Sequence, residues 1–151
     1  MREFERKQLL ERIEREGATV GAEIPETITV QGEPVDLQEF VFEIKRRETV
    51  PSSERERVDR AKKNLRRERL QRKQRIEEAD LTFAEGERLA ESIIGIDRAL
   101  TALEQLEPVD IETEAQRQKT ADRKRWMRFL QQALGNADQD SAHGTTRGGS
   151  R

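Results

Sequence analysis

The residues of this chain whose types could do chemistry are mostly basic, and they concentrate between Arg55 and Arg75. This stretch of 21 residues holds eleven Lys or Arg and three acids, whereas the 151-residue chain has a formal net charge of −2. Guanidinium and ammonium groups at this density are suited to binding the phosphates of a nucleic acid. Acids of the same protein could instead neutralise them when the chain folds.

Two groups of basic residues are candidates for contact with RNA or DNA. Five members of the stretch recur at helical spacing, so they would follow one side of a helix: Arg55, Lys62, Arg66, Arg69 and Lys73. The second group surrounds the single tryptophan, Trp126, and comprises Arg123, Arg125 and Arg128. A ring flanked by cations could stack on an unpaired base. Trp126 also falls on the apolar side of its own segment, which favours a position in the core.

Other chemistries find little support in the residues. The chain has no Cys, which excludes disulfides and thiol catalysis, and its single His is His143. It contains no glycine-rich phosphate loop, no nucleophile elbow and no HExxH motif. Glu87 and Glu91 lie four residues apart, but no second acidic motif or His accompanies them. We therefore expect no enzyme, no metal and no cofactor.

The elements that must position the basic residues are helices. The basic stretch lacks Gly and Pro and predicts one helix over about 53–78, with a capping box beginning at Ser53. A second helix over about 83–106 begins with a capping box at Thr82. Its apolar residues follow the alternating steps of four and three that are typical of coiled coils: Leu89, Ile93, Ile96, Leu100 and Leu103. The short link between the two favours a long antiparallel helical hairpin.

Shorter elements flank this hairpin and complete a mainly α fold. Helices are predicted over 3–16, 36–47 and 112–134, and a small β-hairpin over about 27–37 with its return strand starting at Val35. We expect residues 1–135 to form a single helical domain. The Asp, Ser, Gly and Thr of 136–151 predict a disordered tail. No apolar run approaches the roughly 20 residues that span a bilayer, so we expect a cytoplasmic protein with no membrane contact.

Three residues of the helix over 83–106 predict close packing. Asp97 lies among apolar residues and would need a donor if buried, so we expect an ion pair with an Arg of the basic helix. Gly86 and Gly95 each weaken a helix by about 1 kcal/mol relative to Ala. Close approach of another element would explain both glycines.

Four segments resemble a small family of uncharacterised proteins from halophilic archaea. They are ERKQLLERIEREGATVGAEIP at 5–25, RRERLQR at 66–72, SIIGIDRALTALEQL at 92–106 and ADRKRWMRFLQQALG at 121–135. The resemblance implies a cytoplasm rich in potassium chloride and transfers no activity. At 1 M salt the Debye length is roughly 3 Å, and about six phosphate contacts would lose on the order of five decades of affinity from 0.1 M. Directional Arg contacts would persist best.

Two functional hypotheses follow from these observations. The first is a non-enzymatic helical interaction or adaptor protein that binds a macromolecular partner or forms a homodimer. The second is an RNA- or DNA-binding protein that uses the basic helix 55–75 and the cluster 123–128. The first would use the exposed sides of the helical hairpin and of the Trp126 helix. The second requires exposed basic residues, so the surroundings of these side chains bear on it.

Overall fold

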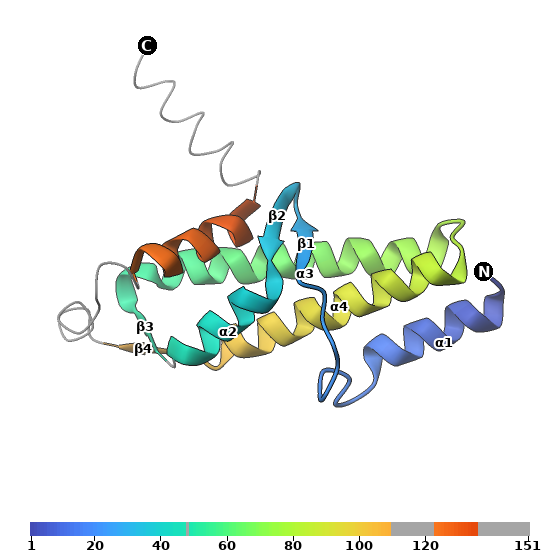
Figure 1. Ribbon diagram of the computed structural model, residues 1–151, viewed down its shortest axis with the longest axis horizontal. Coiled ribbons are helices and arrows are strands. Elements are labelled where there is room, and N and C mark those ends of the chain that lie inside the picture. The colour runs from blue at the N-terminus through green and yellow to red at the C-terminus, as the bar shows by residue number, and fades with distance from the viewer. Residues whose placement is uncertain (48, 110–122, 136–151) are drawn as a thin grey trace, which may run out of the picture.

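Two long antiparallel helices, α3 (Arg55–Glu78) and α4 (Phe83–Glu104), form the axis of the molecule (Figure 1). The structure is a computed structural model, and it describes residues 1–47, 49–109 and 123–135. The mainly helical fold and the predicted helical hairpin are confirmed. The predicted tail 136–151 and the first part of the predicted last helix, 112–122, lie outside the described residues.

The starts of the two long helices differ. At α4 the predicted capping box is confirmed, because Thr82 Oγ1 accepts from the Glu85 amide at 3.1 Å and Glu85 Oε1 accepts from the Thr82 amide at 3.0 Å. The predicted capping box at Ser53 is wrong. A 3-10 turn, η1 (Ser52–Glu54), precedes α3, and the Glu54 side chain is buried elsewhere and caps nothing.

Two shorter helices pack along α4. Helix α1 (Glu3–Glu14) lies beside the first half of α4, and α2 (Leu37–Arg47) beside its second half (Figure 1). A Cβ atom on Gly86 would lie 2.7 Å from Leu9 Cδ1, and one on Gly95 would lie 2.7 Å from Leu37 Cδ2. The prediction that close approach explains both glycines is therefore confirmed.

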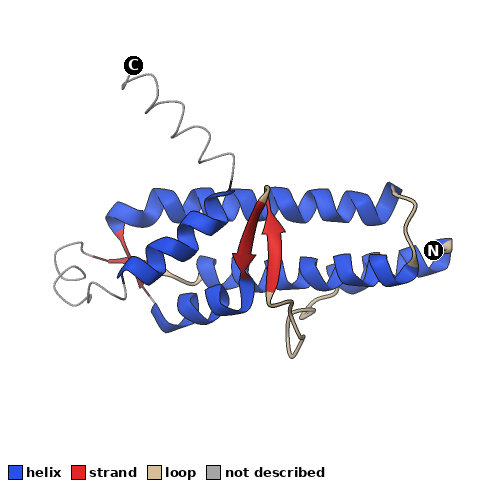
Figure 2. Cartoon of the chain, turned by 45° about the horizontal axis from the view of Figure 1, so that its top comes forward, coloured by secondary structure: helices blue, strands red, loops and turns tan. Residues whose placement is uncertain are grey.

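The predicted β-hairpin is present and lies across the long helices (Figure 2). Strands β1 (Thr27–Val30) and β2 (Glu33–Asp36) are antiparallel, and Gln31 and Gly32 make the turn with φ of 47° and 87°. The return strand starts two residues earlier than predicted and includes Pro34. Pro34 pairs with Thr29, one step beyond the pair that flanks the turn. At such a step the residues do not exchange backbone hydrogen bonds, so proline is tolerated.

A second, parallel strand pair was not predicted. Strand β3 (Thr49–Pro51) pairs with β4 (Glu107–Val109), with Val50 opposite Pro108. Strands of three residues are too short to show an alternating pattern. The pair joins the segment before α3 to the segment after α4, at the end of the molecule opposite the turn between these helices (Figure 1).

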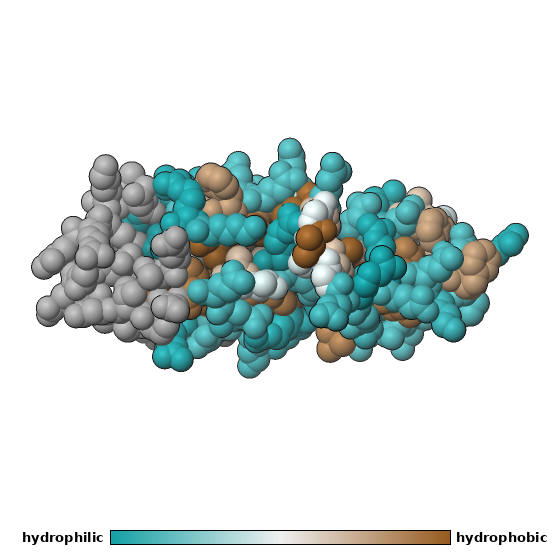
Figure 3. All heavy atoms as spheres, turned by 90° about the horizontal axis from the view of Figure 1, so that it is seen from below, coloured by the Kyte–Doolittle hydropathy of each residue, from teal (hydrophilic) through white to brown (hydrophobic). Residues whose placement is uncertain are grey.

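The core is divided into two clusters that lie along the helical hairpin of α3 and α4. One contains α1 and the C-terminal half of α3, and the other contains α2, the β-hairpin, the N-terminal half of α3 and residues 123–135. On α3, Arg69 and Arg72 lie between Leu65 of one cluster and Ile76 of the other. Outside these clusters the surface seen from below is mainly hydrophilic, with small separate apolar patches (Figure 3). Charged residues make up 40% of the chain, which explains a core of narrow stripes.

Candidate nucleic-acid interface

Helix 123–135 lies beside α3, so some basic residues of the two segments share one surface. Residues 123–135 are helical and run parallel to the N-terminal half of α3. The order of the contacts shows this direction. Arg57 Nη1 lies 3.6 Å from Met127 Sδ, and Asn64 Nδ2 donates to the carbonyl of Ala133 at 3.4 Å and to that of Leu134. About seven residues of α3 therefore accompany about seven residues of the later helix.

Trp126 anchors helix 123–135 in the hydrophobic core. Its side chain is fully buried, and its ring centroid lies 6.5 Å from that of Phe40, which also stacks on Phe129 at 6.1 Å. The guanidinium of Arg47 lies over the Trp126 ring, 4.5 Å from its centroid. The prediction of a core position is confirmed, and a ring buried in this way has no free face for a base.

Two buried carboxylates lie beneath the basic residues of this helix. Glu43 is 4% exposed, and its Oε2 accepts from Arg125 Nε at 3.1 Å. Glu54 is 2% exposed, and its Oε2 lies 4.0 Å from Arg123 Nη2. Because burying a carboxylate without a partner is costly, these contacts direct two of the predicted contact residues, Arg123 and Arg125, partly inward.

The basic residues on the outer side of the two parallel helices form a continuous group. They recur every three or four residues on α3, next to the side that contacts Met127, and they continue on the neighbouring helix. We call this group the basic surface, and its members are Arg57, Arg60, Lys63, Arg67, Lys124 and Arg128. All six are exposed. The acidic residue on the same side of α3 is Glu56, one turn before Arg60.

The stripe predicted on α3 lies on a different side of that helix. Its C-terminal members contact acids of the protein: Arg69 Nε lies 2.7 Å from Asp97 Oδ1, and Lys73 Nζ lies 3.3 Å from Glu14 Oε1. Lys62 lies 3.7 Å from Asp59. Arg55 and Arg66 are exposed on the same stripe. Of the eight predicted contact residues, only Arg128 belongs to the basic surface.

The network around Arg69 confirms the predicted ion pair of Asp97. Burial raises the pKa of Asp97 even though Arg69 donates to it. Burial opposes the charge of Arg69 as well, but the hydrogen bond to Asp97 raises the pKa of Arg69. Burial also acts on Glu14, yet hydrogen bonds from Lys73 and Arg69 lower the pKa of Glu14. These ion pairs therefore join α3 to α1 and to α4.

Sequence reasoning missed Arg57, Arg60, Lys63, Arg67 and Lys124 as a group. Their spacing on α3 is as helical as that of the predicted stripe, so periodicity could not rank one side above the other. The location of helix 123–135 makes the difference, because it adds two cations to one side of α3 and none to the other. No pattern in the sequence reports that contact between residues some 70 positions apart.

Neither a metal centre nor a membrane span is present in the described part of the chain. There, no three His, Asp or Glu side chains are grouped to hold a metal ion. Within the same residues, no helix combines the length and the apolarity needed to cross a bilayer.

Comparison with known proteins places most of the chain in one sequence family. A family model described as a family of unknown function, DUF5788, matches residues 1–131. No curated protein and no solved structure matches the chain.

Proposed function

Because the chain belongs to this family of unknown function, we propose a function from the geometry of the basic surface. The protein is a non-enzymatic helical binding protein, and its partner is a nucleic-acid duplex. The observation that supports this proposal is the convergence of six exposed Lys and Arg from two parallel helices. Cations on neighbouring ridges suit the phosphates of a sugar–phosphate backbone.

The placement of the aromatic rings favours a duplex over a single strand. Proteins that bind single strands stack bases on exposed rings, usually in a basic groove. The chain has five Phe and one Trp, and the two that lie on helix 123–135, Trp126 and Phe129, are buried. Phe4 and Phe42 are exposed but belong to α1 and α2. The basic surface therefore offers charge and hydrogen-bond donors without a stacking platform.

We propose in addition that the protein works in the cytoplasm of a halophilic archaeon, as the sequence resemblance implies. In molar potassium chloride, point charges contribute little and bidentate guanidinium contacts contribute most. Four of the six members of the basic surface are Arg. We expect Arg67→Lys with Arg128→Lys to weaken duplex binding more at 1 M than at 0.1 M potassium chloride.

Fluorescence anisotropy with labelled duplex and single-stranded RNA and DNA of equal length tests this function. The test variant combines Arg67→Gln, Lys124→Gln and Arg128→Gln. A matched control, Lys7→Gln with Arg15→Gln and Arg75→Gln, removes the same charge from exposed positions outside the basic surface. We expect the wild type and the control to prefer duplex. For the test variant, the slope of log affinity against log salt should fall by about 2.7, or 0.9 for each phosphate that is no longer neutralised.

Two results would overturn the proposal. One is equal loss of affinity in the test and control variants, since binding would then follow net charge alone. The other is equal or tighter binding of single strands. Light scattering on the same samples checks for the homodimer, and duplex binding that requires self-association would assign the basic surface to a different role.

A further inference from the structure

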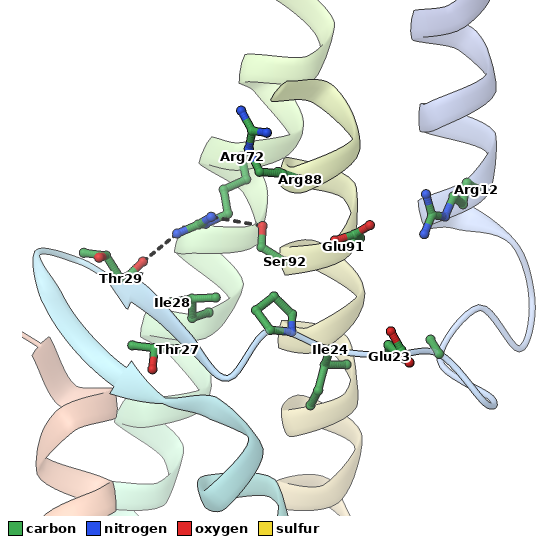
Figure 4. Close-up of a pocket in the computed structure, with 12 residues that line it drawn as sticks. Arg12, Glu23, Ile24, Thr27, Ile28, Thr29, Arg72, Arg88, Glu91 and Ser92 are labelled. Atoms are coloured by element: carbon green, nitrogen blue, oxygen red, sulfur yellow. Dashed lines mark hydrogen bonds between the residues drawn. The ribbon is translucent and has the colours of Figure 1, made fainter. Parts of the chain in front are cut away.

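A cavity of about 630 Å³ lies on the side of the molecule away from helix 123–135, where α1, α3, α4, β1 and the link 22–25 meet (Figure 4). Three arginines from three different helices line it: Arg12, Arg72 and Arg88. Its volume falls in the range of about 300–1,000 Å³ that is usual for small-molecule sites. The basic surface is not part of this cavity, and neither the family match nor the proposed function accounts for it.

Arg72 is held in place by its neighbours. Its Nε lies 2.9 Å from Glu68 Oε2, its Nη1 2.9 Å from Ser92 Oγ and its Nη2 2.7 Å from the carbonyl of Thr29. A guanidinium carries five N–H groups. Among the described residues, one N–H on each terminal nitrogen is left without an acceptor, and the side chain is 14% exposed. A fixed guanidinium with two such donors can bind an oxyanion without losing further side-chain freedom.

The other two arginines enlarge the positive charge of the cavity. In Figure 4 Arg12 extends from α1 toward Glu91 of α4. In the described part of the chain, no carboxylate lies within 4.0 Å of the guanidinium of Arg12 or Arg88. Glu23 and Glu91 also line the cavity, and Glu68 pairs with Arg72, so three cations face three acids in and around the cavity. This balance favours a ligand with one anionic group over a polyanion.

The remaining wall is apolar and gives room for more than an ion. Ile24, Pro25 and Ile28 line it, and Ile24 and Ile28 are otherwise buried in the core. We propose that this cavity binds a small organic oxyanion, a phosphate monoester or a carboxylate. Its oxygens accept from the two remaining N–H groups of Arg72, whereas Arg12 and Arg88 add positive charge to the cavity wall, and its carbon skeleton lies against Ile24 and Ile28.

Titration calorimetry at low ionic strength with glycerol phosphate, butyrate and inorganic phosphate tests the proposal. We expect saturable binding of one or both organic probes, tighter than that of inorganic phosphate, and the tighter organic probe identifies the class. Arg12→Gln or Arg88→Gln should weaken it several-fold, because each removes a positive charge from the cavity wall. Glu91→Gln should strengthen it several-fold by removing a like charge.

The controls separate this cavity from other basic surfaces. Arg75→Gln and Glu11→Gln change exposed residues outside the cavity lining and should leave the affinity unchanged. The triple variant of the basic surface should retain the oxyanion site, so loss of duplex binding and loss of oxyanion binding are distinguishable. Amide chemical shifts should move at Thr29 and Ser92. Absence of saturable binding by either organic probe, equal effects of Arg88→Gln and Arg75→Gln, or weaker binding in Glu91→Gln would overturn the proposal.

Discussion

Trp126 donates its indole N–H to the buried carboxylate of Glu54, with 2.6 Å between Nε1 and Oε1. This bond joins helix 123–135 to the residue that precedes α3, 72 positions earlier in the chain. Both side chains are at least 98% buried, so neither has water as an alternative partner. The same contact withdraws Glu54 from capping α3 and Trp126 from any role in base stacking.

The Trp126–Glu54 bond gives a first prediction. Trp126→Phe keeps a ring but leaves Oε1 of a buried carboxylate without its donor, which should cost about 1–3 kcal/mol of unfolding free energy. Glu54→Gln keeps an acceptor for the indole and should cost less. Equilibrium urea denaturation followed by circular dichroism measures both. The bond would not be stabilising if Trp126→Phe unfolded within about 0.5 kcal/mol of the wild type.

Asn64 provides a second prediction, on the attachment of helix 123–135. Its buried amide donates to the carbonyls of Ala133 and Leu134, in the last described turn of that helix. Asn64→Ala should destabilise the protein by about 1–2 kcal/mol. Hydrogen exchange should accelerate first in residues 123–135. Uniform acceleration over α1 and α4 would mean that the amide supports the whole fold and not this helix in particular.

The two close-approach glycines should respond differently to alanine. In a helix, Gly→Ala alone is stabilising by about 1 kcal/mol. A Cβ on Gly95 would meet Leu37 Cδ2 at 2.7 Å and also the Ile24 Cβ at 3.3 Å, an atom fixed by its backbone. A Cβ on Gly86 would meet only the ends of the Leu9 and Met1 side chains.

We therefore expect Gly95→Ala to be net destabilising by about 1–2 kcal/mol and Gly86→Ala to be closer to neutral. Thermal denaturation of the two variants in parallel measures the difference. An increase in the melting temperature of Gly95→Ala would show that Ile24 and the link 22–25 move aside easily.

Glu14 predicts a pH dependence of stability. Its pKa is lowered in the fold, so its contribution is present above the ordinary value near 4.5 and is lost as the pH falls through the folded value. Glu14→Gln removes contacts of 3.2 Å to Arg69 and 3.3 Å to Lys73. The Glu14 side chain is 50% exposed, so the loss at pH 7 should stay below about 1 kcal/mol.

Urea denaturation at neutral and acidic pH checks this dependence. The difference between Glu14→Gln and the wild type should vanish in acid, and Glu11→Gln, on an exposed part of α1, serves as the control. The raised pKa of Asp97 acts with the opposite sign, so that stability falls as the pH rises. Both proteins carry Asp97, so the subtraction removes this effect except for the smaller part by which the charge of Glu14 raises the pKa of Asp97. A difference that persists unchanged in acid would contradict the assignment.

Much of the fold could be predicted because local rules and burial agree. The apolar steps from Leu89 to Leu103 define α4, and Thr82 begins it with a capping box that forms as predicted. The short hairpin, the ion pair of Asp97 and the core position of Trp126 also follow from patterning. The parallel pair β3–β4 does not, because three-residue strands have no period and their partners are more than 50 positions apart.

The amino-acid sequence by itself determined which segments are helical, which faces are apolar, and that cations outnumber acids on α3. Only the tertiary structure decided which of those cations are exposed together. The basic residues of α3 recur at the same spacing on each side of the helix, whereas other elements contact only some of those sides. Acids from α1 and α4 engage one side of α3, and helix 123–135 extends the other with Lys124 and Arg128. Long-range packing made that distinction, because Coulomb energy depends on distance in space and not on separation along the chain.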